Sequence, residues 1–322
     1  MHKRMYGLFA LSVAIILASC SQLPIFWAIE QEIKLAEPAI RGNVYSVVRC
    51  GNYLYAANGN VYRKHRTSER GWEKISAPPN GAEYLASSNT HVYALSAHEN
   101  DCQVYSYNPL TNTWQEVSDA SGKADEVVIF DNGVSGAGRL AYVRVGGNVY
   151  KLLPTGKATT AEPATNGAGA NTKAAAAGSS GDYFSNTRAF CSDDSGSNLY
   201  SVADDGKTIK HGATFAALTN TSVQTSETIT CLVYMFDGTD PYLIAGTKKG
   251  LEKIVLSSGI PQSAGILGSN AEAAFGESEI FCVAFFRDGS NYAIYTGTGK
   301  ASASKHNALW AYYPSRGNWN YE

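Results

Sequence analysis

The sequence has few of the features from which catalysis, metal binding or nucleic-acid binding is predicted. It contains only 3 methionines and 6 histidines among 322 residues. Beyond the first twenty residues no apolar run reaches the roughly 20 residues that a membrane-spanning helix needs. The net charge is −2, or about −4 without Lys3 and Arg4, and no basic run is present. Nucleic-acid binding therefore has no electrostatic support.

The spacing of cysteine and histidine also does not indicate a metal site. No cysteine pair has the CxxC spacing of a zinc ligand set, and only His91 and His98 would come within ligand spacing, by meeting across a turn. We expect surface or strand-end histidines, no metal and no cofactor. Five cysteines follow Cys20, too many by one to pair internally, and we expect most of them to be buried thiols. The residues are His2, His65, His91, His98, His211 and His306, and Cys50, Cys102, Cys191, Cys231 and Cys282.

The N-terminus has the pattern of an export signal. The chain begins with basic residues, continues with an apolar run from Met5 to Leu17, and then has small residues of the kind found at a cleavage site. This pattern predicts a signal peptide over residues 1–19. The stretch Leu17-Ala18-Ser19-Cys20 resembles a bacterial lipobox, which implies that Cys20 carries the lipid. An ordinary signal peptide with a chance cysteine is the alternative. Several acyl chains would anchor the protein stably, and Ser21 in place of aspartate favours the outer membrane.

A structural unit recurs six times along the rest of the chain. Tyrosine and glycine are abundant, with 20 and 31 residues, as suits strands and their turns. Each unit places a turn signal before a short strand start, which is an apolar pair in the first four units and a weaker copy in the last two, with two further strand-like runs ahead of it. The pairs and their neighbours are Asn60-Val61-Tyr62, Gln103-Val104-Tyr105, Asn148-Val149-Tyr150, Asn198-Leu199-Tyr200, Gly250-Leu251-Glu252 and Ala308-Leu309-Trp310. They predict third strands near residues 60–64, 103–107, 148–153, 198–202, 250–255 and 308–312.

The units also share their first and last strands. The run Cys231 to Gly238 matches Cys282 to Gly289 at an offset of 51, and both end in the hairpin signal Asp-Gly. Tyr107 precedes Trp114 by the seven residues that separate Tyr312 from Trp319, and Trp72 lies at nearly the same place in the first unit. We expect the three tryptophans at equivalent positions in fourth strands, with much of each ring buried.

A unit of four short strands and roughly 50 residues has the size of a propeller blade. Its tyrosine, turn and tryptophan resemble the third and fourth strands of the kelch motif, most closely in residues 83–119 and 278–322. The resemblance implies an all-β, six-bladed β-propeller of four-stranded antiparallel blades over residues 42–322. A β-sandwich with coincidental periodicity is the alternative.

Two segments do not fit the unit. Residues 20–41 alternate apolar and charged side chains around Ile29, Ile33 and Leu35, which predicts a strand that closes the ring or a tether from the lipid. Residues 155–182 are rich in small residues and contain no aromatic residue. We expect a flexible insertion there, although it should also hold the last strand of blade 3 and the first of blade 4.

No catalytic constellation stands out. Ser192-Asp-Asp194-Ser-Gly196 resembles the Asp-box of sialidase propellers, which is itself a structural turn. Asp204-Asp205-Gly206 and Asp237-Gly-Thr-Asp240 carry carboxylates that calcium accepts, but they are also ordinary hairpin tips. A copper site of the galactose-oxidase kind cannot be assembled, and no pair of catalytic carboxylates is singled out. We predict no catalytic and no metal-binding residue.

These observations favour a lipid-anchored, extracytoplasmic scaffold without enzymatic activity, bound to protein partners in an envelope assembly. Loops on the two faces of a rigid disc would supply the binding surface. The alternative is a glycan-binding or glycan-active propeller with its ligand at the channel mouth. Nothing in the sequence identifies the partner or the face that binds it.

Overall fold

The computed structural model describes residues 40–66, 71–98, 100–123, 127–131, 139–145, 148–153, 191–193, 195, 197–213, 217–268, 270–288, 291–301 and 306–322. The chain divides into two compact units, Met1–Pro38 and Ala39–Glu322. The first unit lies wholly outside the described residues, and with it the predicted signal peptide and Cys20. Only the second unit is described below.

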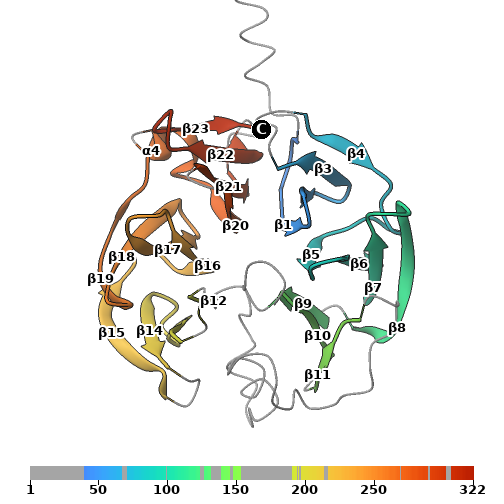
Figure 1. Cartoon of the computed structure of the whole chain (residues 1–322), viewed down its shortest axis with the longest axis horizontal. Helices are drawn as coiled ribbons and strands as arrows, with labels where there is room; N and C mark the ends of the chain where they lie inside the picture. The colour runs from blue at the N-terminus through green and yellow to red at the C-terminus, as the bar shows by residue number, and fades with distance from the viewer. Residues whose placement is uncertain are drawn as a thin grey trace, which may run out of the picture. The chain divides into compact units, whose positions relative to one another are not determined.

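Ala39–Glu322 forms six antiparallel sheets arranged around a common axis (Figure 1). Each sheet is a meander in which consecutive strands pair, and its first strand lies nearest the axis. We number these sheets as blades 1 to 6 in chain order. This arrangement confirms the predicted all-β, six-bladed propeller.

The first three blades contain eleven described strands. Blade 1 contains β1 (Ser46–Cys50), β2 (Tyr53–Ala57), β3 (Val61–His65) and β4 (Glu73–Ile75). Blade 2 contains β5 (Tyr84–Ser87), β6 (Val92–His98), β7 (Asp101–Asn108) and β8 (Thr113–Lys123). Blade 3 contains β9 (Val127–Asp131), β10 (Ala141–Val145) and β11 (Asn148–Lys151), and a fourth strand would fall beyond its described residues.

The last three blades each contain four strands. Blade 4 contains β12 (Cys191–Ser192), β13 (Leu199–Val202), β14 (Thr208–Gly212) and β15 (Thr219–Gln224). Blade 5 contains β16 (Ile229–Phe236), β17 (Pro241–Thr247), β18 (Leu251–Ser257) and β19 (Ile260–Ile266). Blade 6 contains β20 (Glu279–Asp288), β21 (Asn291–Gly299), β22 (Leu309–Tyr313) and β23 (Asn318–Tyr321), and the short helix α4 (Ala271–Phe275) precedes it.

Five of the six predicted third strands coincide with β3, β7, β11, β18 and β22, but the one in blade 4 is wrong. Residues 198–202 form the second strand, β13, and the third strand is β14. The first strand of this blade is β12 at Cys191–Ser192, beyond the segment 155–182 in which we expected it. A turn followed by an apolar pair can precede either a second or a third strand. The pattern therefore predicted correctly that a strand forms here, but it did not predict the position of that strand within the blade.

The hydrophobic core lies between the blades. Five buried clusters each combine residues of two neighbouring blades, in the order 4–5, 5–6, 6–1, 1–2 and 2–3. The inner strands of these neighbours contact one another. At these five junctions the neighbouring blades therefore bury their apolar faces against each other, as a two-sided sheet requires.

Side chains of the inner strands join three consecutive blades to the next blade's backbone. Thr230 Oγ1 donates to the carbonyl of Ile280, Cys282 Sγ approaches the carbonyl of Val44 at 3.9 Å, and Ser46 Oγ donates to Leu85 O at 3.1 Å. Small polar residues thus satisfy buried carbonyl groups at the centre of the ring.

Glycine permits the same close approach in blades 5 and 6. Gly246 pairs with Cys231 and Gly297 pairs with Cys282. A Cβ on Gly246 would lie 2.5 Å from the Cys231 sulfur, and one on Gly297 would lie 2.3 Å from Val44 O. These two glycines therefore cannot be replaced without moving a neighbouring blade.

The start of the described chain joins the last blade. Ile40 N donates to Glu322 O, Leu309 N donates to Ile40 O, and Arg41 forms a bridge with Ala308. Most of the segment 20–41 lies outside the described residues, so whether it is a closing strand or a tether stays open. The predicted insertion at 155–182 also lies outside them.

Candidate functional site

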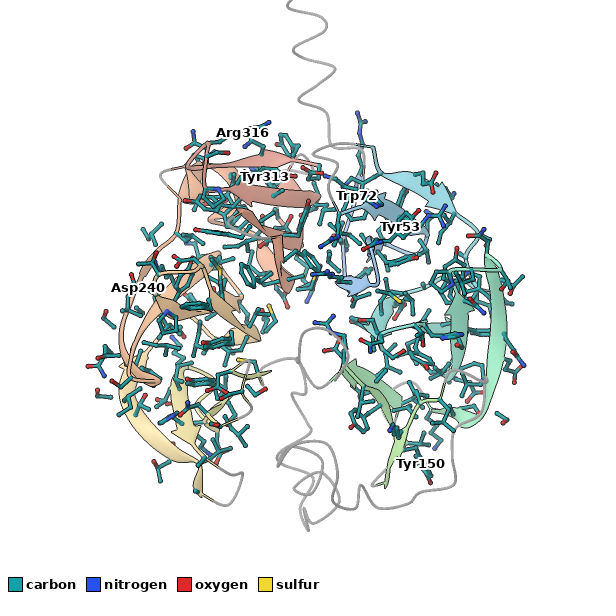
Figure 2. The ribbon with its side chains drawn as sticks, viewed as in Figure 1. Tyr53, Trp72, Tyr150, Asp240, Tyr313 and Arg316 are labelled. Carbon is teal, nitrogen blue, oxygen red and sulfur yellow. The ribbon has the colours of Figure 1, made fainter. Side chains whose placement is uncertain are left out.

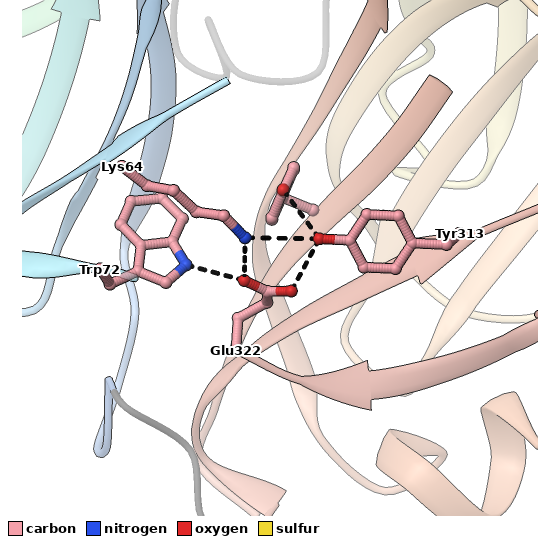
Figure 3. A network of polar contacts seen from close by, with 5 residues as sticks. Lys64, Trp72, Tyr313 and Glu322 are labelled. Atoms are coloured by element: carbon pink, nitrogen blue, oxygen red, sulfur yellow. Dashed lines mark hydrogen bonds and ion pairs between the residues drawn. The ribbon is translucent and has the colours of Figure 1, made fainter. Parts of the chain in front are cut away.

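A buried polar network joins the first and last blades (Figure 3). Lys64 Nζ forms an ion pair with Glu322 Oε2, and the two side chains are 0% and 4% exposed. Trp72 Nε1 donates to the same carboxylate at 2.9 Å, and the Tyr313 hydroxyl donates to Glu322 Oε1 at 2.8 Å. Figure 2 shows Trp72 and Tyr313 at the junction of these blades.

Lys64 occupies a position that holds tyrosine in other blades. Tyr107 lies opposite Trp114 and Tyr312 lies opposite Trp319, with ring centres 4.9 and 5.5 Å apart. In blade 1 the Lys64 ammonium lies 5.7 Å from the Trp72 ring centre instead. Burial, reinforced by Tyr295 and Glu322, raises the pKa of Tyr313. The neutral phenol of Tyr313 and the paired charges of Lys64 and Glu322 are suited to holding the first and last blades of the propeller together.

The predicted tryptophans occupy equivalent places, and each donates its indole N–H to the blade before it. Trp114 Nε1 donates to Ser76 O at 2.7 Å and Trp319 Nε1 to Leu267 O at 2.8 Å, while Trp72 donates to Glu322. Trp319 is 2% exposed, but Trp114 and Trp72 are only half-buried. Trp72 lies just before β4 rather than within it.

The structure gives the described histidines separate neighbours. His211 stacks on Tyr200 with Nε2 3.0 Å from Asn198 Oδ1, and His306 Nδ1 contacts Ala274 O. His91 lies in a turn beside Thr90, and His65 ends β3. Over the described part of the chain, no three side chains of the metal-ligating types gather in one place. His2 and the side chain of His98 lie outside that part.

The carboxylates near the Asp-box and the hairpin tips stabilise turns. Asp193 accepts from the backbone of Ser197 and the amide of Asn198 at 2.8 and 2.7 Å. Although burial raises its pKa, these hydrogen bonds hold the pKa of Asp193 below its usual value. Asp205 and Asp237 accept backbone N–H groups of their own turns in the same way.

The five cysteines of the described chain are free thiols, and all except half-buried Cys282 are buried. This confirms the expectation of buried thiols. Burial raises the pKa of Cys50 to about 12, against a weaker opposing effect of Arg139. Burial also raises the pKa of Cys102 and Cys191. Thiols with raised pKa values are poor nucleophiles, because the thiolate is the reactive form.

Three aromatic rings from consecutive blades meet where the inner strands begin. Tyr45 immediately precedes β1, Tyr84 begins β5, and Phe281 lies near the start of β20. The Tyr45 ring centre lies 5.1 Å from that of Phe281 and 5.9 Å from that of Tyr84. Phe281 is buried, whereas both tyrosines are half-buried. We call these three residues the aromatic strip.

A strained turn holds a lysine over this strip. Lys300 has φ of 56°, which is uncommon for a residue with a side chain. Its ammonium lies 5.6 Å from the Phe281 ring centre and 2.8 Å from the Glu279 carboxylate, whose hydrogen bond raises the pKa of Lys300. A Cβ on the preceding Gly299 would lie 2.0 Å from a Phe281 ring carbon. The turn at Gly299 and Lys300 is thus packed closely against the Phe281 side chain.

Sequence patterns did not single out the strip or Lys300. The only available signal is an aromatic residue at the start of three inner-strand runs, and alternation alone does not show that these strands adjoin. The strip offers amphipathic tyrosine surface, one exposed ammonium and one largely covered carboxylate. Such a surface can bind a partner, but it lacks an acid–base pair of different environments.

No helix in the described residues is long and apolar enough to cross a membrane. The six sheets define a β-propeller in which the aromatic strip lies where three inner strands begin. Residues 4–302 match the model of the TP013X lipoprotein family, and the chain belongs to that family. It is therefore a lipoprotein, anchored in the cell envelope through a lipid.

Relatives with similar sequences are uncharacterized lipoproteins of Treponema pallidum (strain Nichols). One is 32% identical over 120 residues, which cover 36% of this chain and 31% of the relative. Another is 33% identical over 96 residues, covering 29% and 24%. The chain thus spans about a third or less of the length of the relatives it matches.

Two solved propellers resemble the structure weakly. The Cps50 (Swd1) β-propeller domain of Myceliophteria thermophila is 11% identical, with 88% of this chain and 87% of that chain covered at a TM-score of 0.46. The computationally designed protein Ika8 is 11% identical, with 88% of each chain covered at a TM-score of 0.40. The fold assignment rests on the six sheets themselves.

Proposed function

We propose that this lipoprotein is a non-enzymatic scaffold that holds protein partners in an extracytoplasmic envelope assembly. The observation that carries the proposal is the aromatic strip with Lys300 beside it. Tyrosine supplies rigid contact area and a polar hydroxyl at low entropic cost, and it is enriched where proteins bind one another. Because three blades build the strip and a strained turn fixes Lys300, the surface is organised before a partner arrives.

The chemistry of the described side chains supports a binding role. General acid–base catalysis needs groups whose pKa values lie near the working pH. The shifted cysteines and tyrosines have raised pKa values, and the shifted carboxylates have lowered ones. These cysteines, tyrosines and carboxylates keep a single protonation state near neutral pH, and burial lowers the pKa of His91 and of His211 from its usual value. The outer membrane is the location we propose, because Ser21 follows Cys20, the predicted site of the lipid.

The proposal is tested by changing Lys300 in the full lipidated chain. Partners cross-linked in intact membranes are quantified for the wild type, Lys300→Glu and Tyr84→Ala. Lys249→Glu is the matched control, because Lys249 is an exposed lysine in the corresponding loop of blade 5. We expect specific partners to be lost with Lys300→Glu and Tyr84→Ala and kept with Lys249→Glu. The same partners at the same yield in all four proteins would contradict the proposal.

The balanced charge of Lys300 and Glu279 beside aromatic rings also favours a neutral sugar as ligand, the second candidate. A panel of maltotetraose, cellotetraose and chitotetraose distinguishes the two functions by binding and by turnover. Binding that Tyr84→Ala abolishes would favour a glycan-binding propeller. Turnover that disappears when an axis-facing Asp or Glu is replaced would establish an enzyme.

A further inference from the structure

Exposed aliphatic side chains are concentrated on the outer strands of blade 5. Four large hydrophobic residues are exposed in the described chain, and three of them lie on β18 and β19. They are Val255, Ile260 and Ile266, exposed by 44%, 48% and 71%. The fourth, Leu110, lies in a turn of blade 2. Single exposed aliphatic residues are ordinary, but a group of them on one edge marks a contact surface.

The outermost strand of blade 5, β19, carries no charge. Residues 254–271 contain no charged side chain, and every residue of β19 except Pro261 is exposed. On the adjoining strand β18, Glu252 lies opposite Ile266 and accepts a hydrogen bond from Ser226, and the Lys253 ammonium lies 3.9 Å from the Tyr242 ring centre. Outer strands usually carry charges against unwanted pairing, as β8 does with Glu116 and Lys123. We call β19 with Val255 the neutral rim.

Neighbouring blades hold the neutral rim in place at both ends. The Tyr200 hydroxyl of blade 4 donates to Gly259 O at 2.8 Å, immediately before β19. Trp319 of blade 6 donates to Leu267 O at 2.8 Å, immediately after it. The exposed strand between these bonds is thus presented by a rigid frame, not by a free loop.

We propose that the neutral rim rests on the lipid bilayer to which the protein is anchored. The family places the chain at a membrane, and the chain enters the propeller at Ile40, which bonds to Leu309 and Glu322 of blade 6, next to blade 5. An uncharged surface loses little hydration at the interface, and its aliphatic side chains gain by entering the headgroup boundary. The strand's backbone groups stay in the hydrated headgroup layer, which satisfies them.

This contact would stand the ring on its edge. Both ends of the central axis, including the aromatic strip, would then remain open to partners. The proposal depends on the lipid anchor and not on the scaffold function, so each can fail without the other.

Hydrogen exchange of the full lipidated protein in phosphatidylcholine vesicles tests the contact. Flotation with the vesicles first verifies the anchor. We expect amides of residues 257–268 to exchange at least about fivefold more slowly on vesicles than in the soluble Cys20→Ser protein, because the bilayer covers the edge. The comparable outer strand β8 serves as the internal control and should exchange equally in both.

Two variants make the test specific. Ile260→Asn combined with Ile266→Asn should abolish the slowing on vesicles, and Leu110→Asn, a matched exposed aliphatic residue, should not. Equal exchange in vesicles and in solution, equal slowing at β8, or failure to float would overturn the proposal. So would slowing in the soluble protein that grows with protein concentration, because it would identify a second copy as the occupant.

Discussion

At the scale of single residues, the space left by neighbouring strands limits the size of the side chains near the centre of the propeller. Cys231 and Cys282 face glycines that cannot accept a Cβ, and Cys50 lies in the core between blades 1 and 2. Thiols fill these positions as small hydrophobic groups. Burial raises the pKa of the Cys50 thiol, and this connects the stability of the propeller to alkaline pH.

We predict that Cys50 makes the protein less stable above pH 9. The folded thiol keeps its proton to a pKa of about 12, whereas the unfolded thiol loses it near 9.0. The unfolded state is therefore favoured increasingly as pH rises between these values. From pH 7.5 to 10.5 the free energy of unfolding should fall by about 2 kcal/mol more in the wild type than in Cys50→Ala.

Urea denaturation under reducing conditions measures this difference. Cys50→Ala should differ from the wild type by a constant amount below about pH 8, where the thiol is largely protonated in both the folded and the unfolded state. A parallel decline of the two proteins up to pH 10.5 would show that Cys50 does not carry the effect.

At the scale of the element, blades 1, 2 and 6 each connect to the blade before them through a tryptophan in, or just before, the fourth strand. The indole N–H reaches a backbone carbonyl in blades 2 and 6, and a carboxylate in blade 1. Blade 1 is the exception, and it is the blade that adjoins blade 6, the last blade of the chain. There the partner of the tryptophan is Lys64 in place of tyrosine, and a buried ion pair replaces a ring contact.

Trp319→Ala should destabilise the protein by about 3–5 kcal/mol, the usual cost of removing a buried tryptophan. Trp114→Ala should cost about half as much, because its ring is only half-buried. Urea denaturation of both variants at pH 7.5 measures the difference. Equal losses would mean that the indole hydrogen bond, common to both, outweighs burial.

Lys64→Met should cost about 3–5 kcal/mol, because it leaves the Glu322 carboxylate buried without a cation. Adding Glu322→Gln should restore part of this loss. Glu73→Gln is the matched control: it removes the exposed partner of Arg63, whose pair should contribute less than about 1 kcal/mol. A loss from Lys64→Met as small as that from Glu73→Gln would show that the closing ion pair contributes little.

At the scale of the whole molecule, the lipid anchor decides where the propeller acts. The family establishes a lipoprotein, while the attachment at Cys20 is a prediction from the resemblance of Leu17-Ala18-Ser19-Cys20 to a lipobox. Cys20→Ser should move the protein from the membrane fraction to the soluble fraction, since no other anchor is predicted. Mass spectrometry of the mature N-terminus should find a modified Cys20; an unmodified residue at another position would contradict the prediction.

The sequence by itself determined the six repeats, the antiparallel hairpins and five of the six third strands. These depend on local patterns: Asp-Gly turns, apolar pairs and the seven-residue step from Tyr107 to Trp114. It misplaced blade 4, because Asn198-Leu199-Tyr200 has the same local pattern whether its strand is second or third. Order within a blade is a property of pairing and not of composition.

Only the tertiary structure decided which residues from different blades meet. Lys64 and Glu322 are 258 positions apart, and Phe281 meets Tyr45 only because the last blade adjoins the first. Likewise, the exposed side chains of Val255, Ile260 and Ile266 look like core residues in the sequence. Apolar side chains in a strand predict burial, but whether a neighbour covers them depends on how far the outer strand extends beyond the adjoining blades.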